Sequence, residues 1–247
     1  MKVLAIGNSF SCDGTRYLYQ IAKEAGEKEV KIINLHIGGC PLRLHYLNAL
    51  EDAKAYGLDL NGEFTGFHVS IKDALISDEW DIVTIQQQSS RSTNYDTFQP
   101  YLDFMAGYIR KYAPTAKIYL QQTWAYTQEG CEGQGYENHA AMFADIKKSY
   151  EKAAKAIDAD GIIPSGEVMN GLLVNGLDKI HRDPIHASLG VGRYALGLTW
   201  YATLTGKDIV NNTFAPGNTF LSFDETASEV EIAVAKKTVT EVVKEYR

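Results

Sequence analysis

Short apolar runs alternate with stretches of helical character along this sequence, and no other feature restricts the possible folds as much. Five runs lack helical spacing and lead into Gly or polar residues: 3–6, 30–37, 80–85, 117–121 and 161–164. Such runs are typical of strands that are buried on both faces of a parallel sheet. Because strands and helices alternate, we predict an α/β fold with a mostly parallel sheet of about five strands and helices on both faces.

Six further stretches are predicted to be helices: 14–26, 70–77, 98–112, 137–157, 188–204 and 225–246. The Gly-rich stretch 129–135 is predicted to be a loop. No convincing period is present between residues 40 and 66, although the pair Asn61-Gly62 is typical of a hairpin turn. A connection this long without clear elements is more often functional than idle.

Length and composition fit one ordinary globular unit. The chain has 247 residues, of which 45% are apolar, enough to bury a full core. No linker, block of charge or repeat divides it, so we predict a single domain spanning residues 1–247. A net charge of -7 argues against a nucleic-acid partner, because nucleic-acid binding needs a basic face. Nothing in the sequence indicates an oligomeric state.

The apolar runs also indicate where in the cell the protein is expected. None is long enough to span a bilayer, so we expect no membrane partner. Gly7-Asn8-Ser9 interrupts the first run almost at once, which is unlike a signal peptide. We expect a soluble, cytoplasmic protein, or a secreted or periplasmic one if the sequence has been shortened at its start.

The three cysteines, Cys12, Cys40 and Cys131, are an odd number and lie far apart. They contain no zinc-type pair, so the sequence predicts neither a disulfide framework nor a structural metal site. We predict no metal and no cofactor.

Two short motifs carry candidate chemistry. Ser9 follows the first strand, where ligands of open α/β sheets bind, and the helix after it would point its N-terminus at the same place. Asp183-Pro-Ile-His186 puts a carboxylate and an imidazole on one loop, so Asp183 can orient the ring and leave its other nitrogen free as a base. The alternative is structural: Asn8, Ser9 and Ser11 would only cap a helix, Asp183 would cap another, and His186 would be a surface residue.

At this point the chain resembles the SGNH (GDSL-like) hydrolase superfamily. The resemblance rests on the order of four blocks: Gly7-Asn8-Ser9, Gly38-Gly39, a polar residue after the third strand, and Asp183-x-x-His186. Further segments are similar to an uncharacterised bacterial branch: Gly39-Cys40-Pro41-Leu42, Trp80-Asp81, Gln86-Gln87-Gln88-Ser89 and Gln122-Thr123-Trp124-Ala125-Tyr126. The resemblance implies a flavodoxin-like, three-layer α/β/α fold and ester hydrolysis, which in many members is the deacetylation of carbohydrates.

The resemblance also implies roles for individual residues. Ser9 would be the nucleophile, His186 the general base and Asp183 its orienting acid. The oxyanion hole would comprise the N–H groups of Ser9 and Gly39 together with a side-chain amide, for which we name both Gln88 and Gln87. The chain departs from the family pattern in two places. Asn8 replaces the usual Asp before the serine, and the Gln run replaces the Gly-x-Asn-Asp block.

The substrate is less readable from the sequence. We expect a small-molecule ester or an acetylated glycan, with Trp124, Tyr126 and His45 as candidate substrate-binding residues. The alternative is a non-catalytic binding protein with the same flavodoxin-like fold. The loop after the first strand would then bind a phosphate-bearing ligand or a glycan without cleaving it.

Overall fold

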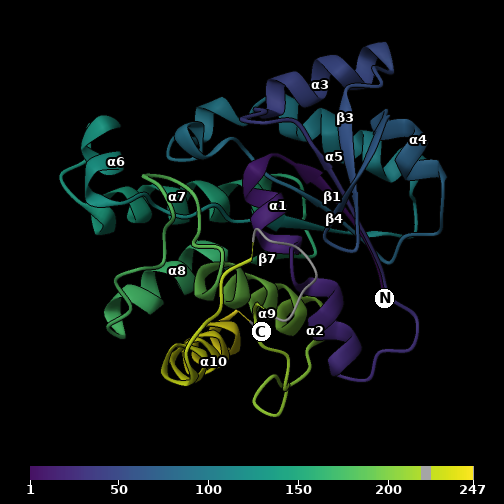
Figure 1. Ribbon diagram of the computed structural model, residues 1–247. Coiled ribbons are helices and arrows are strands. Elements are labelled where there is room, and N and C mark those ends of the chain that lie inside the picture. Colours follow the sequence, from purple (N-terminus) through teal and green to yellow (C-terminus); the bar gives the residue numbers. More distant parts are fainter. Residues whose placement is uncertain (218–223, 247) are drawn as a thin grey trace.

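A seven-stranded sheet lies at the centre of the protein in the computed structural model, which describes residues 1–217 and 224–246 (Figure 1). Its order is β4-β3-β2-β1-β5-β6-β7. The strands are β1 (Lys2–Gly7), β2 (Lys31–His36), β3 (Tyr56–Leu60), β4 (Glu63–Val69), β5 (Ile82–Ile85), β6 (Lys117–Gln121) and β7 (Gly161–Ile163). The predicted α/β class is confirmed, but the sheet has two more strands than expected.

The five predicted strands pair in parallel, as their continuous apolar runs indicated. β1 lies between β2 and β5, with Leu4 opposite Ile33 on one side and Val83 on the other. Residues 3–6 of β1 are buried almost completely, because helices cover both faces of the sheet there. β6 and β7 extend the parallel part beyond β5.

The two additional strands form an antiparallel hairpin within the stretch that showed no period. β3 pairs with β2, and β4 is the outer strand, with most of its side chains at least partly exposed. Asn61 and Gly62 form the predicted turn, with positive φ angles of 54° and 88° as a type I′ hairpin requires. The side chains of this edge strand are exposed on both faces, Phe64 and Phe67 included, so its apolar and polar residues do not alternate and the sequence did not reveal it.

Helices cover the sheet on both sides (Figure 1). One layer includes α3 (Leu42–Glu51), α4 (Ile71–Ile76) and α5 (Tyr101–Tyr112), and α7 (His139–Ala156) packs on β6 and β7. The other layer comprises α1 (Ser9–Thr15), α2 (Leu18–Glu24), α8 (Ser165–Val174), α9 (Val191–Thr205) and α10 (Glu229–Glu245). Among the described residues, no helix has both the length and the apolar character needed to cross a membrane.

Helix boundaries differ from the predictions where side-chain capping decides them. α1 begins at Ser9 rather than near residue 14, because the Asn8 side chain accepts a hydrogen bond from the Phe10 N–H and caps it. The predicted loop 129–135 contains the short helix α6 (Gln128–Gly133), started by a Thr127 cap. The helices α3 and α8 were not predicted. α10 starts after a Ser228 capping box.

The topology places the candidate site at one edge of the sheet. From β1 the chain continues to β2 on one side, whereas β5, β6 and β7 follow on the other. In open α/β sheets, ligands bind at the carboxyl ends of the strands where this direction changes. Ser9 follows β1, and Gln86, Gln87 and Gln88 follow β5, so the two predicted blocks meet at this point.

Candidate active site

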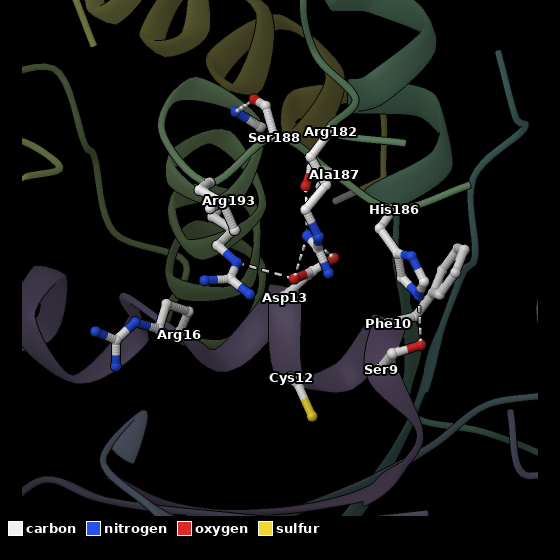
Figure 2. A network of polar contacts seen from close by, with 12 residues as sticks. Ser9, Phe10, Cys12, Asp13, Arg16, Arg182, His186, Ala187, Ser188 and Arg193 are labelled. Carbon is white, nitrogen blue, oxygen red and sulfur yellow. Dashed lines mark hydrogen bonds and ion pairs between the residues drawn. The ribbon is translucent and has the colours of Figure 1, made fainter. Parts of the chain in front are cut away.

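Ser9, His186 and Asp183 form a continuous chain of hydrogen bonds. The Ser9 Oγ lies 2.9 Å from the His186 Nε2, and Figure 2 shows the two side chains facing each other from α1 and from the loop before α9. The His186 Nδ1 lies 2.8 Å from the Asp183 Oδ2. With the proton on Nδ1, the ring donates to the carboxylate and its Nε2 accepts from the serine hydroxyl. The structure therefore brings together two motifs that are 177 positions apart.

The Asp183 carboxylate is held in its charged form. Partial burial works against the charge, but the Ile185 and His186 N–H groups donate to Oδ1, and the His186 ring donates to Oδ2. These hydrogen bonds prevail over burial and lower the pKa of Asp183 to about 2. At neutral pH the group behind the imidazole is thus an anion, as an orienting acid must be.

Asn8 connects three loops beneath the serine. Its Oδ1 accepts from the Phe10 N–H at 3.0 Å and from the Gln86 Nε2 at 2.8 Å, and its Nδ2 donates to the Cys40 carbonyl oxygen at 3.2 Å. An amide can donate and accept at once, whereas an ionised carboxylate can only accept. The two departures from the family pattern, Asn8 and the Gln run, therefore contact each other in this fold.

The loop that carries His186 is anchored by Trp124, which was expected to contact substrate. The Trp124 side chain is fully buried, stacks on the Phe10 ring at a centroid distance of 3.9 Å, and donates from Nε1 to the Ile185 carbonyl oxygen at 3.0 Å. Phe10 in turn lies 5.9 Å from the His186 ring. Trp124 supports the loop from below and does not line the pocket, so that expectation is corrected.

A second anchor, Asp13, was not recognised in the sequence. Its fully buried carboxylate accepts from the Arg182 Nη1 on both oxygens at 2.9 Å and from the Arg193 Nε at 2.8 Å (Figure 2). The Arg182 Nη1 also donates to the Ala187 carbonyl oxygen at 2.5 Å. These bonds join α1, which carries the serine, to the residues on either side of Asp183 and His186.

A pocket of about 470 Å³ opens beside the Ser9 hydroxyl. It is lined by residues of the loops after β1, β2, β5 and β6 and of the His186 loop: Asn8, Ser9, Phe10, Gly38, Gly39, Gln88, Ser89, Ser90, Tyr126, Gln134, Ile185 and His186. A larger cavity of about 850 Å³, near Met1 and Trp80, lies at the amino ends of the parallel strands. It holds no pairing of a nucleophile with a base, so we place the candidate site at the smaller pocket.

Three donors are available near the Ser9 hydroxyl. The N–H groups of Ser9 and Gly39 have no hydrogen-bond acceptor within the described ranges, and the Gly39 φ of +62° is one that favours glycine. The Gln88 Nε2 lies close to Gly39, 3.7 Å from where a Cβ on that residue would be. The Gln88 Oε1 accepts from the Arg91 Nε at 3.0 Å, so the amide presents its donor end to the pocket.

Gln87 points elsewhere, although the sequence could not separate it from Gln88. The Gln87 Nε2 donates to the Thr97 carbonyl oxygen at 2.8 Å, and its Oε1 accepts from the Leu42 N–H at 2.9 Å. Its buried amide thus joins the β5 loop to α3. Gln87 is corrected from an oxyanion donor to a residue that holds the loop.

The two remaining substrate candidates also differ from each other. Tyr126 lines the pocket, with its hydroxyl 2.6 Å from the Ser89 Oγ. His45 is fully buried, and its Nδ1 lies 2.8 Å from the Tyr56 hydroxyl. Burial lowers the pKa of His45 to about 3. The expectation that His45 contacts substrate is wrong, because its ring is buried between α3, which carries it, and Tyr56 of β3.

The protein-family comparison identifies one family along nearly the whole chain. The model described as "Domain of unknown function (DUF4886)" matches residues 2–236. No match was found among curated protein sequences. A DUF4886 family protein from Bacteroides uniformis ATCC 8492 is similar in structure, with a TM-score of 0.87 and 29% sequence identity over 99% of this chain and 95% of that one.

More distant solved structures identify the fold. A candidate SGNH hydrolase from Slackia heliotrinireducens has a TM-score of 0.60 at 18% identity, covering 83% of this chain and 98% of its own. An acetyl xylan esterase, AlAXEase, has a TM-score of 0.53 at 14% identity, covering 82% and 98%. The chain therefore has the fold of the SGNH and GDSL-like hydrolases, as the sequence motifs predicted.

Replacing Asp13 by asparagine should destabilise the protein strongly. Asp13→Asn removes the buried carboxylate that the partly buried guanidinium groups of Arg182 and Arg193 share, and breaking a buried ion pair typically costs about 3–5 kcal/mol. Urea unfolding measures this loss. Glu241→Gln serves as the control, since its exposed pair with Lys237 should contribute less than about 1 kcal/mol. Equal, small losses in the free energy of unfolding of both variants would show that the ion pairs of Asp13 do not stabilise the fold.

The burial of His45 predicts a dependence of stability on pH. Below pH 6.5 the unfolded chain takes up a proton at this ring and the folded chain does not, so stability is present above pH 6.5 and is lost as pH falls toward about 3. Between pH 6.5 and 4.5 the loss is about 2–3 kcal/mol. Urea unfolding of His45→Gln should lack this part of the pH slope, while the exposed His68→Gln keeps it. An unchanged slope in His45→Gln would contradict a neutral, buried ring.

Proposed function

The chain belongs to the DUF4886 family, and we propose that it is a serine ester hydrolase whose nucleophile is Ser9. One observation carries this proposal: the continuous hydrogen-bond relay formed by Ser9, His186 and Asp183. The Ser9 Oγ lies 2.9 Å from the His186 Nε2, and the His186 Nδ1 lies 2.8 Å from the Asp183 Oδ2. The structural reading, in which these residues only cap helices, accounts for Asn8 but not for this relay. A protein that only binds phosphate or glycan would have no use for the Asp183–His186 pair.

The relay suits a two-step acyl transfer. Ser9 Oγ attacks the ester carbonyl carbon while its proton passes to the His186 Nε2, and Asp183 stabilises the imidazolium that forms. The tetrahedral intermediate collapses, and the leaving alcohol takes the proton from His186. Water then gives a proton to His186 and attacks the acyl-serine. The second tetrahedral intermediate then collapses, which releases the carboxylic acid and returns the proton from His186 to Ser9.

The negative oxygen of each tetrahedral intermediate needs donors fixed in advance. The Ser9 N–H lies at the start of α1, where the first N–H groups of a helix have no internal partner. The Gly39 N–H and the Gln88 Nε2 reach the same pocket from the loops after β2 and β5. We assign the oxyanion hole to these three groups, with Gln88 in the place of the asparagine that the superfamily uses.

The pocket supports an acylated carbohydrate as the substrate class. Amide and hydroxyl groups of Gln88, Ser90 and Gln134 line it, and such groups hydrogen-bond well to sugar hydroxyls. Tyr126 adds an aromatic wall. One solved structure of the same fold is an acetyl xylan esterase. We propose that the acyl group is small, with acetyl the first to test.

Removing the nucleophile should abolish turnover and leave the fold intact. Ser9→Ala should lower kcat/KM for p-nitrophenyl acetate by at least about a thousandfold, because no other group can form the acyl intermediate. Ser77→Ala is the control, since Ser77 is exposed at the end of α4 and does not line the pocket. Stopped assays on acetylated xylo-oligosaccharides extend the measurement to the proposed substrate. Full activity in Ser9→Ala would end the proposal.

Gln88 and Gln87 should respond differently to alanine substitution. Gln88→Ala removes an oxyanion donor and should lower kcat by about a hundredfold or more, with little change in KM or stability. Gln87→Ala leaves the Leu42 N–H and Thr97 groups unpaired, so it should cost about 1–3 kcal/mol of stability. Steady-state kinetics and urea unfolding on both variants separate the roles. Undiminished kcat in Gln88→Ala would remove it from the oxyanion hole.

A further inference from the structure

A third cavity, of about 530 Å³, lies beside α1 and shares no lining residue with the Ser9 pocket. Cys12, His36 and Asp59 line it, and one potential ligand atom from each lies within 4.8 Å of the other two. In Figure 2 the Cys12 thiol points away from the Asp13 carboxylate, its neighbour in the chain. The cavity is therefore separate from the relay, although both begin on the same helix.

The fold assembles these three residues from distant positions. His36 is at the end of β2, Asp59 is on the neighbouring strand β3, and Cys12 comes from α1 above them. Asn34 and His36 are two residues apart on β2, so their side chains lie on the same face of the sheet. Asn34 is paired directly with Asp59 across the two strands. No ligand pair is close in the sequence, which is why the cysteine spacing predicted no metal site.

The His36 ring is held with its Nδ1 toward the carboxylate. The ring occupies the space over Gly57, where an added Cβ would lie 3.0 Å from its Cε1, and the Phe64 ring meets it edge-on. The Nδ1 lies 3.2 Å from the Asp59 Oδ2, and yet this buried nitrogen has no hydrogen-bond partner. A nitrogen and an oxygen that lie this close with no hydrogen bond between them are a suitable pair of ligands for one cation. Tetrahedral zinc sites separate neighbouring ligand atoms by about 3.3–3.8 Å.

Asn34 fixes the other two ligand atoms. Its Nδ2 donates to the Asp59 Oδ2 at 2.8 Å and reaches the Cys12 Sγ at 3.3 Å. The Asn34 side chain is 1% exposed, so this orientation is enforced by packing. Groups that hydrogen-bond to ligand atoms in this way orient metal sites from outside the coordination sphere.

The Asp59 carboxylate also has no basic side chain paired with it. Within the part of the chain that the structure describes, it contacts the Asn34 Nδ2 and the His36 Nδ1, and no Arg or Lys forms an ion pair with it. A largely buried carboxylate without a guanidinium or ammonium partner favours a bound cation.

We propose that Cys12, His36 and Asp59 form a binding site for a zinc-class divalent cation, with a fourth position open to the cavity for water. Thiolate and imidazole ligands select zinc over magnesium or calcium, which prefer oxygen ligands. Bound there, the cation would tie α1 to the β2–β3 strands one turn beyond Ser9. The proposal does not depend on ester hydrolysis.

Cobalt substitution tests the site directly. The full-length protein is treated with a chelator and titrated with Co²⁺, and absorption is recorded. We expect one equivalent to bind with the ligand-field bands of tetrahedral cobalt and a thiolate-to-cobalt charge-transfer band, and Zn²⁺ to displace it. Thermal unfolding with Zn²⁺ alone should show a higher Tm for the metal-loaded protein.

Matched variants separate this site from adventitious binding. Cys12→Ser should lose the charge-transfer band, and Cys131→Ser, which changes a buried thiol elsewhere, should keep it. His36→Gln should raise the Zn²⁺ Kd at least a hundredfold, whereas His68→Gln, on the outer strand β4, should not. Circular dichroism checks that each variant folds. Less than a tenth of an equivalent in the wild type, or binding unchanged in both folded Cys12→Ser and His36→Gln, would overturn the proposal.

Discussion

A buried carboxylate needs a positively charged partner. In this protein the ion pairs of Asp13 with Arg182 and Arg193 position the residues of the Ser9–His186–Asp183 relay. Asp13 is one turn beyond Ser9 on α1, and its partners Arg182 and Arg193 flank the Asp183–His186 loop. An unpaired buried charge is far too costly to tolerate, so the fold closes only with this loop drawn onto α1. The imidazole then comes within hydrogen-bond reach of the serine. The geometry of the relay thus depends on an ion cluster that lies outside the relay itself.

The same edge of the sheet shows how a chain can depart from a family pattern and keep its geometry. Asn8 and Gln86 join through their amides, so the loops after β1 and β5 are fixed to each other. This leaves Gln88, two positions later, free to turn its amide toward Gly39. Two changes that look independent in the sequence are therefore one arrangement in space. A glutamine amide donates as an asparagine amide does, and it reaches one methylene further from the backbone.

Some of this could be predicted from the sequence, and the reasons differ from residue to residue. The parallel strands were found because burial on both faces leaves continuous apolar runs, as at residues 3–6. The β4 strand was missed because its edge position leaves it largely exposed. Trp124 was misjudged because a loop sequence does not reveal which side chains fold inward, and His45 because the helix that carries it, α3, was not predicted. Asp13 gave no signal, since its partners are 169 and 180 positions away.

The central claim is that the relay makes one serine hydroxyl nucleophilic, and covalent labelling measures that property without knowledge of the substrate. The native protein is treated with a fluorophosphonate, and the modified residue is identified by mass spectrometry of its peptides. The account predicts a single adduct on Ser9, formed much more slowly when His186 is replaced by alanine. No adduct under conditions that label a known serine esterase, or an adduct on another serine, would contradict it.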